Sequence, residues 1–235
     1  MTATPRALAA LLSYPTADLI AALPEIEAIL ADSPAKAGLR ELVASLRDTD
    51  LLDAQERYVQ LFDRTRSLSL HLFEHVHGDG RERGPAMVEL NGIYAAAGLM
   101  PDTHELPDYL PMLLEFCSVD AEQGRMLLRN AAPVIDLIHG RLIAHGSPYA
   151  AVLRSALLFC DIQPSKRKQA AEPRETHEEM DRNWEEAAVL FGPGADPKAE
   201  CGADMLAAKM RAAARAPNPT PRRPILRRIA TVSQG

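Results

Sequence analysis

The apolar residues of this chain recur every three or four positions over most of its length, which is the spacing of amphipathic α-helices. In the first quarter the pattern predicts helices over about residues 8–12, 19–30, 39–46 and 51–62. Pro24 lies inside the second of these and is the point at which that helix would kink. Because only short stretches separate them, these helices are expected to be antiparallel neighbours.

A second set of helices follows a compact apolar piece, Leu68 to Val76, and a glycine-bearing loop at residues 77–80. These predicted helices are residues 85–98, 107–117, 128–142 and 149–160. The third of them has the strongest amphipathic pattern in the chain, and residues 101–105 are predicted to be a loop. We find no convincing alternation of apolar and polar residues, so no strand is predicted.

Composition agrees with a helical protein, because alanine and leucine dominate and only 5% of the residues are aromatic. We predict an all-α fold in which residues 1–163 form a single helical bundle domain of mostly antiparallel helices. Residues 164–204 are polar and charged and are predicted to be a linker with an accessory helical segment. Residues 205–235 are basic and rich in proline, which predicts a disordered tail.

Charge is unevenly distributed along the chain. The net charge of −6 divides into +7 for residues 205–235, which contain no acidic residue, and −13 for residues 1–204. An acidic body repels nucleic acid and anionic lipid and attracts basic partners. The tail is the exception, and a separate interpretation is that it tethers the protein to RNA, to anionic lipid or to its own acidic body.

Cysteine content and hydropathy indicate the compartment. Cys117, Cys160 and Cys201 are odd in number and widely spaced, so neither a disulfide framework nor a thiolate zinc site is predicted. Cys117 and Cys160 lie on apolar helix faces and are expected to pack in the core. No apolar run is long enough to span a bilayer, and the expected location is cytoplasmic.

The sequence His71-Leu72-Phe73-Glu74-His75 matches H-x-x-E-H, in which two histidines bind zinc and the glutamate acts as a base. Such a site needs a third ligand, for which the sequence offers Glu115, Glu122, Glu178 and Glu179 without selecting one. Since only three positions of the pattern are fixed, exposed polar residues on a short helix are the simpler interpretation. A zinc metallohydrolase is therefore kept as the alternative to a binding protein.

A binding protein is indicated by acidic and apolar residues that alternate over three predicted helices. The acidic residues are Glu74, Glu89, Glu105, Asp108 and Glu115. The apolar residues are Leu72, Phe73, Leu90, Tyr94, Pro107, Tyr109 and Leu113. Packed together, they would line a groove with an apolar floor and an acidic rim, the complement of a basic amphipathic helix. The alternative, which composition alone favours, is that the acids form only a solvated face.

The same residues carry a resemblance to a known family. The run FDRTRSLSLHLFEHVHG at residues 62–78 and the run ELPDYLP at residues 105–111 resemble the NarJ-type assembly chaperones of respiratory nitrate reductase. These belong to the wider TorD/DmsD group of redox-enzyme maturation chaperones. The similarity reaches from about residue 6 to residue 195 and is densest between residues 58 and 116.

The resemblance implies a TorD-like, all-helical cytoplasmic protein with no catalytic residues, no metal and no cofactor of its own. It implies binding to the N-terminal peptide of the nitrate reductase catalytic (alpha) subunit, which is basic and amphipathic. The chaperone would keep that subunit immature while the molybdenum cofactor and an iron–sulfur cluster are inserted, and would not be part of the final enzyme. Proteins that deliver the molybdenum cofactor are further candidate partners, whereas nucleic acid and stable membrane insertion are not implied.

Overall fold

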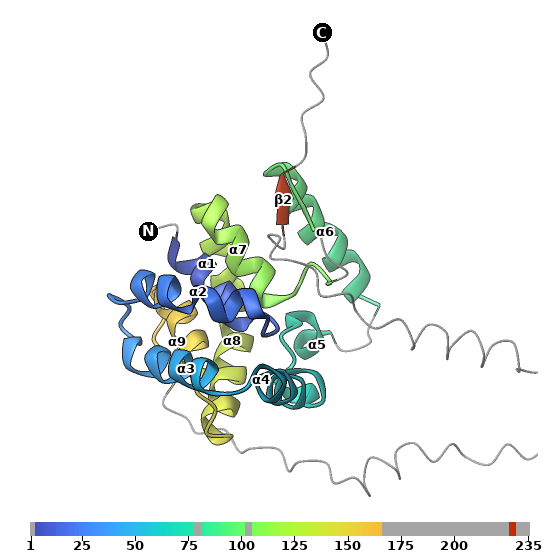
Figure 1. The fold of residues 1–235 in the computed structure, drawn as a ribbon. Helices are drawn as coiled ribbons and strands as arrows, with labels where there is room; N and C mark the ends of the chain where they lie inside the picture. The colour runs from blue at the N-terminus through green and yellow to red at the C-terminus, as the bar shows by residue number, and fades with distance from the viewer. Residues whose placement is uncertain (1–2, 78–80, 102–104, 166–225, 229–235) are drawn as a thin grey trace, which may run out of the picture. The chain divides into compact units, whose positions relative to one another are not determined.

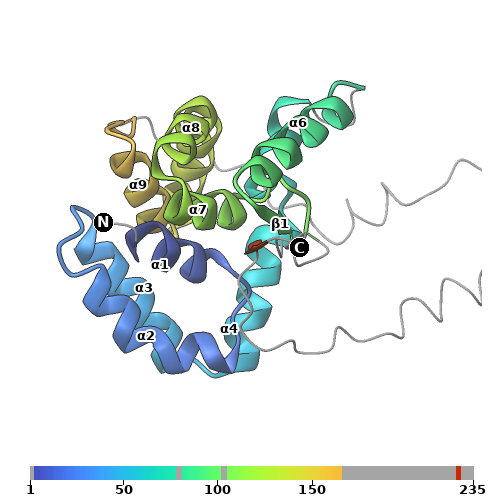
Figure 2. The same cartoon turned by 90° about the horizontal axis from the view of Figure 1, so that it is seen from above.

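Helix α1 (Ala3–Leu12) is surrounded by later helices because its sequence, ATPRALAALL, is apolar on almost every side. Its buried residues pack against α7 (Leu110–Val119) and α9 (Ala150–Phe159). Figure 2 shows α1 between these helices and the pair formed by α2 (Ala17–Ile29) and α3 (Lys36–Asp48). The first predicted helix is therefore the central element of the bundle.

In this computed structural model the described residues are 3–77, 81–101, 105–165 and 226–228, all within one unit that comprises residues 1–172 and 221–235. Residues 166–204 of the predicted linker, with its accessory helix, and most of the predicted tail lie outside the described residues. Within the described residues the fold is all-α apart from two short strands, and this confirms the predicted fold class (Figure 1). None of the helices described is long and apolar enough to cross a membrane.

Two of the first four helices begin with side-chain caps that the sequence supplies. The hydroxyl of Thr16 accepts from the backbone N–H of Leu19 at the start of α2, and the carboxylate of Asp50 accepts from Leu52 at the start of α4 (Leu51–Tyr58). The helix predicted over residues 51–62 changes character at Val59, where a π-helical turn, η1 (Val59–Asp63), begins. A 3₁₀ turn, η2 (Arg66–Leu68), and the short helix α5 (Leu72–Val76) follow.

The second half contains the long helix of the bundle. Helix α6 (Arg83–Ala96) leads into strand β1 (Leu99–Pro101), and α7 is followed by α8 (Ala121–Ala144), which extends the predicted helix over residues 128–142 in both directions. Helix α8 packs against both α7 and α9 (Figure 1). Asp120 caps α8 by accepting from the N–H of Gln123.

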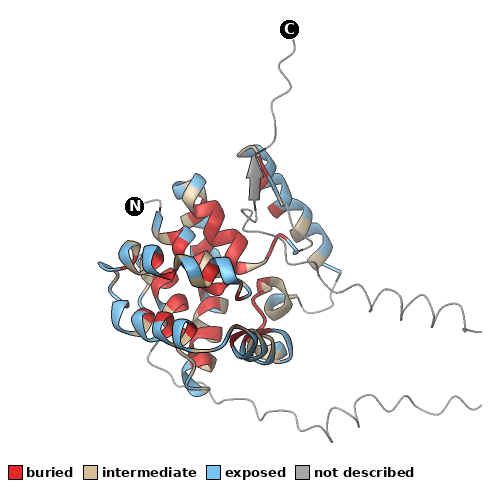
Figure 3. Ribbon diagram, viewed as in Figure 1, coloured by how far each residue is buried: buried red, intermediate tan, exposed pale blue. Residues whose placement is uncertain are grey.

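Two apolar clusters form the core, and Figure 3 shows the buried residues concentrated where α1, α7, α8 and α9 meet. The main cluster joins these helices to α2, α3 and α4. The second is smaller and joins α6, β1 and α7; its buried members are Leu90, Tyr94, Leu99, Met112 and Phe116. We call it the α6–α7 cluster.

The prediction that the chain has no strand is wrong at two places. Strand β1 pairs antiparallel with β2 (Leu226–Arg228), which lies within the tail that we predicted to be disordered. The pairing joins residues far apart in sequence, and each strand is only three residues long, so neither leaves a local alternating pattern. The remainder of residues 205–235 lies outside the described residues.

Candidate functional site

The two sequence runs that carry the family resemblance meet in the structure. The segment Ser69–Phe73 lies alongside the segment Glu105–Leu110, and we call this pair of segments the motif junction. The N–H of Leu110 donates to the carbonyl of Leu70 (2.9 Å), and the N–H of Leu72 donates to the carbonyl of Asp108 (3.2 Å). These bonds explain why α7 begins at Leu110 instead of at the predicted Pro107, because the preceding backbone is paired with the first segment.

Asp108 holds the motif junction together with its side chain. Its side chain is fully buried, and one carboxylate oxygen accepts from the N–H of Phe73 (2.9 Å) in the first turn of α5. His71, at the N-cap position of α5, makes no side-chain cap of its own. Asp108 therefore caps α5 from a distant part of the chain and places its negative charge at the helix start.

His71 lies between two carboxylates. Its ring Nδ1 is 3.4 Å from Asp108 Oδ1, and its Nε2 is 3.4 Å from Glu105 Oε2. Burial by itself lowers the pKa of His71, but the hydrogen bonds to Asp108 and Glu105 outweigh burial and raise the pKa to about 9. His71 is consequently an imidazolium at neutral pH, with both ring N–H groups directed at carboxylates.

Tyrosine hydroxyls connect the motif junction to α1. The hydroxyl of Tyr58 donates to the carbonyl of Leu12 (2.6 Å), so the hydroxyl of Tyr109, 3.0 Å away, must donate to Tyr58. The Tyr109 ring also stacks on His71, with ring centroids 5.2 Å apart. Burial raises the pKa of both tyrosines, so they remain neutral donors at any physiological pH.

The H-x-x-E-H residues are not arranged as a zinc site. His71 precedes α5 instead of lying one turn from His75 on a helix face, and both of its nitrogens face carboxylates. The Nε2 of His75 donates to the carbonyl of Ser69 (2.9 Å), and Glu74 pairs with Arg83 (3.4 Å). Among the described residues no group of three or more histidine, cysteine, aspartate or glutamate side chains could hold a metal ion.

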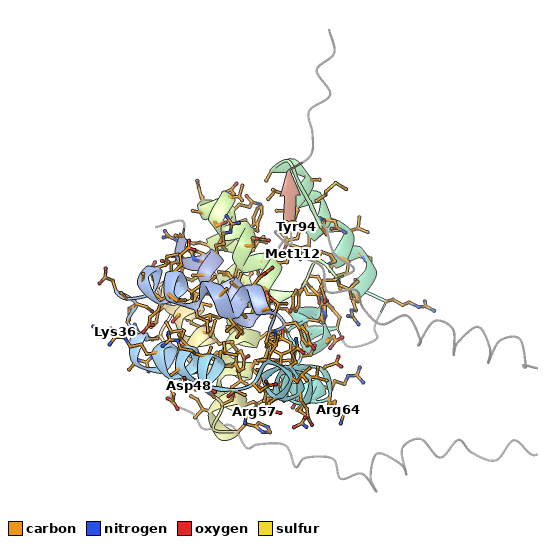
Figure 4. The ribbon with its side chains drawn as sticks, viewed as in Figure 1. Lys36, Asp48, Arg57, Arg64, Tyr94 and Met112 are labelled. Carbon is orange, nitrogen blue, oxygen red and sulfur yellow. The ribbon has the colours of Figure 1, made fainter. Side chains whose placement is uncertain are left out.

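The predicted apolar residues are divided between the two clusters. Leu90 and Tyr94 are buried in the α6–α7 cluster, and Phe73 and Tyr109 are partly buried against it. Figure 4 shows Tyr94 and Met112 between α6 and α7. Leu72 and Leu113 belong to the main cluster, and Pro107 is buried with its carbonyl accepting from the Tyr94 hydroxyl (2.9 Å).

The predicted acidic rim has a different distribution from the one we expected. Glu89 and Glu105 are exposed, and Glu74 is half-buried. Asp108 and Glu115 are 1% and 8% exposed, which is too little for a solvent-facing rim. Asp108 lies just before α7 and Glu115 lies within it. All residues of α7 from Leu110 to Cys117 are buried, so the packing of this helix buries both carboxylates.

Sequence reasoning missed several residues that shape this region. Leu99, Met112 and Phe116 complete the α6–α7 cluster, and Tyr58 links the motif junction to α1. Met112 and Phe116 have a usable signal, since they are apolar and one helical turn apart on α7. Leu99 has none, because its burial depends on β1.

The two cysteines of the described residues behave as predicted for core thiols. Cys117 and Cys160 are buried and free. Burial raises the pKa of Cys117 to about 12 and that of Cys160 to about 11, so neither is a thiolate near neutral pH. They offer no nucleophile.

Known proteins similar to this chain cover most of the described residues. A family model described as nitrate reductase delta subunit matches residues 30–154. The nitrate reductase molybdenum cofactor assembly chaperone NarJ of Escherichia coli (strain K12) is 40% identical over 195 residues, which cover 77% of this chain and 81% of that protein. The "Probable nitrate reductase molybdenum cofactor assembly chaperone NarW" of the same strain is 39% identical over 159 residues, covering 65% and 69%. The family match includes both segments of the motif junction.

Proposed function

This chain belongs to the nitrate reductase delta subunit family, and from that membership we propose that it is the assembly chaperone of a nitrate reductase. It is not an enzyme, since the relatives that establish the family are chaperones. Its partner is the catalytic subunit of the reductase, and it assists insertion of the molybdenum cofactor into that subunit. The single observation that carries this proposal is the 40% identity to NarJ over 77% of the chain.

We further propose that the chaperone recognises a basic amphipathic segment at the N-terminus of that subunit. Residues 1–204 have a net charge of −13, which favours a basic ligand. Exposed apolar side chains lie on the segments that flank the α6–α7 cluster, among them Met100 and Leu106, and the exposed Glu105 lies next to Leu106. Apolar and acidic groups close together suit a peptide that has one apolar and one basic face.

The remaining parts of the proposal come from the family. The chaperone acts in the cytoplasm, keeps the catalytic subunit open for the molybdenum cofactor and an iron–sulfur cluster, and leaves before the enzyme is complete. Proteins that deliver the molybdenum cofactor are the natural second partners of such a complex.

Peptide titration tests the recognition step. A synthetic peptide with the first residues of the catalytic subunit from the same organism is titrated into the full chain by isothermal calorimetry at low salt, with a scrambled peptide as control. We expect a Kd of about 1 μM or lower, or roughly −8 kcal/mol. Glu105→Gln should weaken binding, whereas Glu27→Gln on α2, which pairs with Arg47, should not. No binding of the native-order peptide at low salt would rule out this recognition.

A genetic experiment tests the chaperone role itself. Cells that lack this chain should accumulate catalytic subunit with little molybdenum, measured by metal analysis of the purified subunit, and re-expression should restore it. A normal molybdenum content without the chain would contradict the assignment.

A further inference from the structure

The turn between α1 and α2 holds an exposed aromatic side chain in a fixed position. Tyr14 is 46% exposed, and its ring stands edge-on to the buried ring of Tyr58, with centroids 5.7 Å apart. The backbone beside it is also held, because Pro15 is buried and its carbonyl accepts from Gln55 Nε2 of α4 (2.8 Å). Figure 2 shows this turn beside α4. One side of the Tyr14 ring is therefore packed, while the other side is available to a partner.

Helix α4 adds apolar and acidic side chains next to this turn. Leu52 and Glu56 are four residues apart on α4, so they share a helix face with Gln55, which bonds to the turn. Leu52 is 73% exposed, and Glu56 is exposed as well. We call Tyr14, Leu52 and Glu56 the Tyr14 surface. It combines two exposed apolar side chains with a carboxylate.

A row of aromatic rings joins the Tyr14 surface to the motif junction. Beyond Tyr58, whose hydroxyl is 3.0 Å from the hydroxyl of Tyr109, the Tyr109 ring stacks on His71. The Nε2 of His71 is 3.4 Å from Glu105 Oε2. Tyr109 and His71 are half-buried, and Glu105 is exposed. Side chains in direct contact thus connect an exposed glutamate of the motif junction with the exposed groups of the Tyr14 surface.

We propose that Tyr14 is an anchor for the client, the N-terminal segment of the catalytic subunit, which binds as an amphipathic helix along this row. Its apolar face packs on Tyr14 and Leu52, and its basic side chains face Glu56 and Glu105. This inference rests on the proposed function, because the occupant is the client proposed above.

Charge and order favour this occupant. Exposed carboxylates lie at both ends of the row, and residues 1–204 carry a net charge of −13, so a basic helix is favoured over an acidic one. A helix bound in this way presents an apolar residue every three or four positions, which suits separate apolar contacts at Tyr14 and Leu52. Because Tyr14 is already held against Tyr58, ordering it on binding costs little conformational entropy.

Calorimetric titration of the client peptide into the full chain tests the anchor. Tyr14→Ala removes the ring and should weaken binding about tenfold, whereas Tyr14→Phe keeps the ring and should bind within about twofold of wild type. Met126→Ala is the matched control, since Met126 is 49% exposed at the start of α8, and it should bind as wild type. Equal loss in Tyr14→Ala and Tyr14→Phe would overturn the role of the ring.

Cross-linking gives a readout of proximity that a purely structural role of Tyr14 would not produce. The photoreactive residue p-benzoylphenylalanine is incorporated in place of Tyr14 and irradiated with the client peptide. It should cross-link to an apolar residue of the peptide, identified by mass spectrometry, and the same probe in place of Met126 should not. Cross-linking to a second copy of the chain instead would show that the Tyr14 surface is a contact between copies, and would overturn the proposal.

The acidic end of the site is tested separately. Glu56→Gln should weaken binding about threefold at low salt and less at high salt, because the charge lies at the exposed margin of the site. Glu41→Gln, at an exposed position of α3, is the control and should bind as wild type. Undiminished affinity of Glu56→Gln at low salt would mean that the helix does not extend to α4.

The pattern of affinities separates this inference from the proposed function. If the client peptide binds wild type and Tyr14→Ala equally, the anchor is wrong and the chaperone assignment stands. If it binds neither, the proposed recognition fails, and the anchor fails with it. Circular dichroism of Tyr14→Ala should match wild type, so that a lost affinity reports the missing ring.

Discussion

Asp108 shows how one buried carboxylate can organise the motif junction without facing solvent. It accepts from the backbone of Phe73 and faces the His71 ring, while its own carbonyl accepts from Leu72. A fully buried carboxylate is stable only when its lone pairs are satisfied and an opposite charge is near. Asp108 meets both conditions, so its first role is structural.

Replacing Asp108 should therefore cost stability. Asp108→Asn keeps an oxygen that can accept from Phe73 but leaves the His71 imidazolium with one carboxylate fewer, and we expect a loss of about 2–3 kcal/mol in the free energy of unfolding. Urea denaturation followed by circular dichroism at pH 7 measures it. Glu89→Gln, at an exposed position of α6, is the control and should change stability by less than about 0.5 kcal/mol. Equal stability of the two variants would show that Asp108 does not hold the motif junction.

The charge on His71 predicts a pH dependence with a definite sign. The folded-state pKa of about 9 lies above the ordinary value of 6.5, so the unfolded chain releases this proton first as pH rises. The stabilisation is complete below pH 6.5 and is lost as pH rises through 9. Its size is on the order of 2 kcal/mol, allowing for the partial exposure of the ring.

Urea midpoints at pH 6.5, 8 and 9.5 test this dependence in wild type and His71→Gln. Buried thiols with raised pKa also destabilise the fold at alkaline pH, but they do so equally in both proteins. The difference in unfolding free energy between the two proteins should shrink as pH rises. A difference that stays constant would mean that His71 is neutral in the fold.

Residue types and short-range patterns predicted the apolar face of α6, but they did not predict the burial of Asp108. Leu90 and Tyr94 share one face of α6, as their helical spacing predicted, and both are buried in the α6–α7 cluster. Asp108 was placed on a rim because a carboxylate is usually exposed. Its burial depends on a contact with residues more than thirty positions earlier, which no local pattern contains.

Among the elements, the helices were predictable and the strands were not. The 3.6-residue period is repeated over ten or more residues in α3, α8 and α9, so each helix has a strong local signal. Strands β1 and β2 are three residues each and exist only as a pair. The change from α-helix to a π-helical turn at Val59 also leaves no sequence signal. It changes which backbone groups hydrogen-bond to each other, whereas the spacing of apolar residues along the sequence stays the same.

Helix packing predicts opposite effects for two glycines. A Cβ at Gly124 in α8 would lie 2.7 Å from both the Cα and the Sγ of Cys117, so α7 and α8 approach too closely for alanine. We expect Gly124→Ala to lower the free energy of unfolding by about 1–3 kcal/mol despite the better helix propensity. Gly92→Ala in α6 is the control; its Cβ would meet nothing within 4 Å, and it should raise stability by about 0.5–1 kcal/mol. Thermal denaturation of the three proteins decides it, and a stabilised Gly124→Ala would contradict the close contact.

At the scale of the whole molecule, charge separates the two ends of the sequence. Residues 1–204 carry −13 and residues 205–235 carry +7, so the chain contains both an acidic body and a basic segment of its own. Opposite charges on one chain attract each other at an effective concentration that a separate peptide must exceed. This explains how a three-residue pairing such as β1–β2 can form at all, since three residues of ladder are marginal alone.

The same charge distribution predicts how binding of the client peptide responds to salt. Raising NaCl from 50 mM to 500 mM shortens the Debye length from about 14 Å to about 4 Å and screens an acidic body from a basic peptide. We expect the affinity of wild type for the catalytic-subunit peptide to fall about tenfold, with most of the change in the association rate. Stopped-flow anisotropy measures the association and dissociation rates, and an affinity independent of salt would mean that apolar contact alone recruits the client.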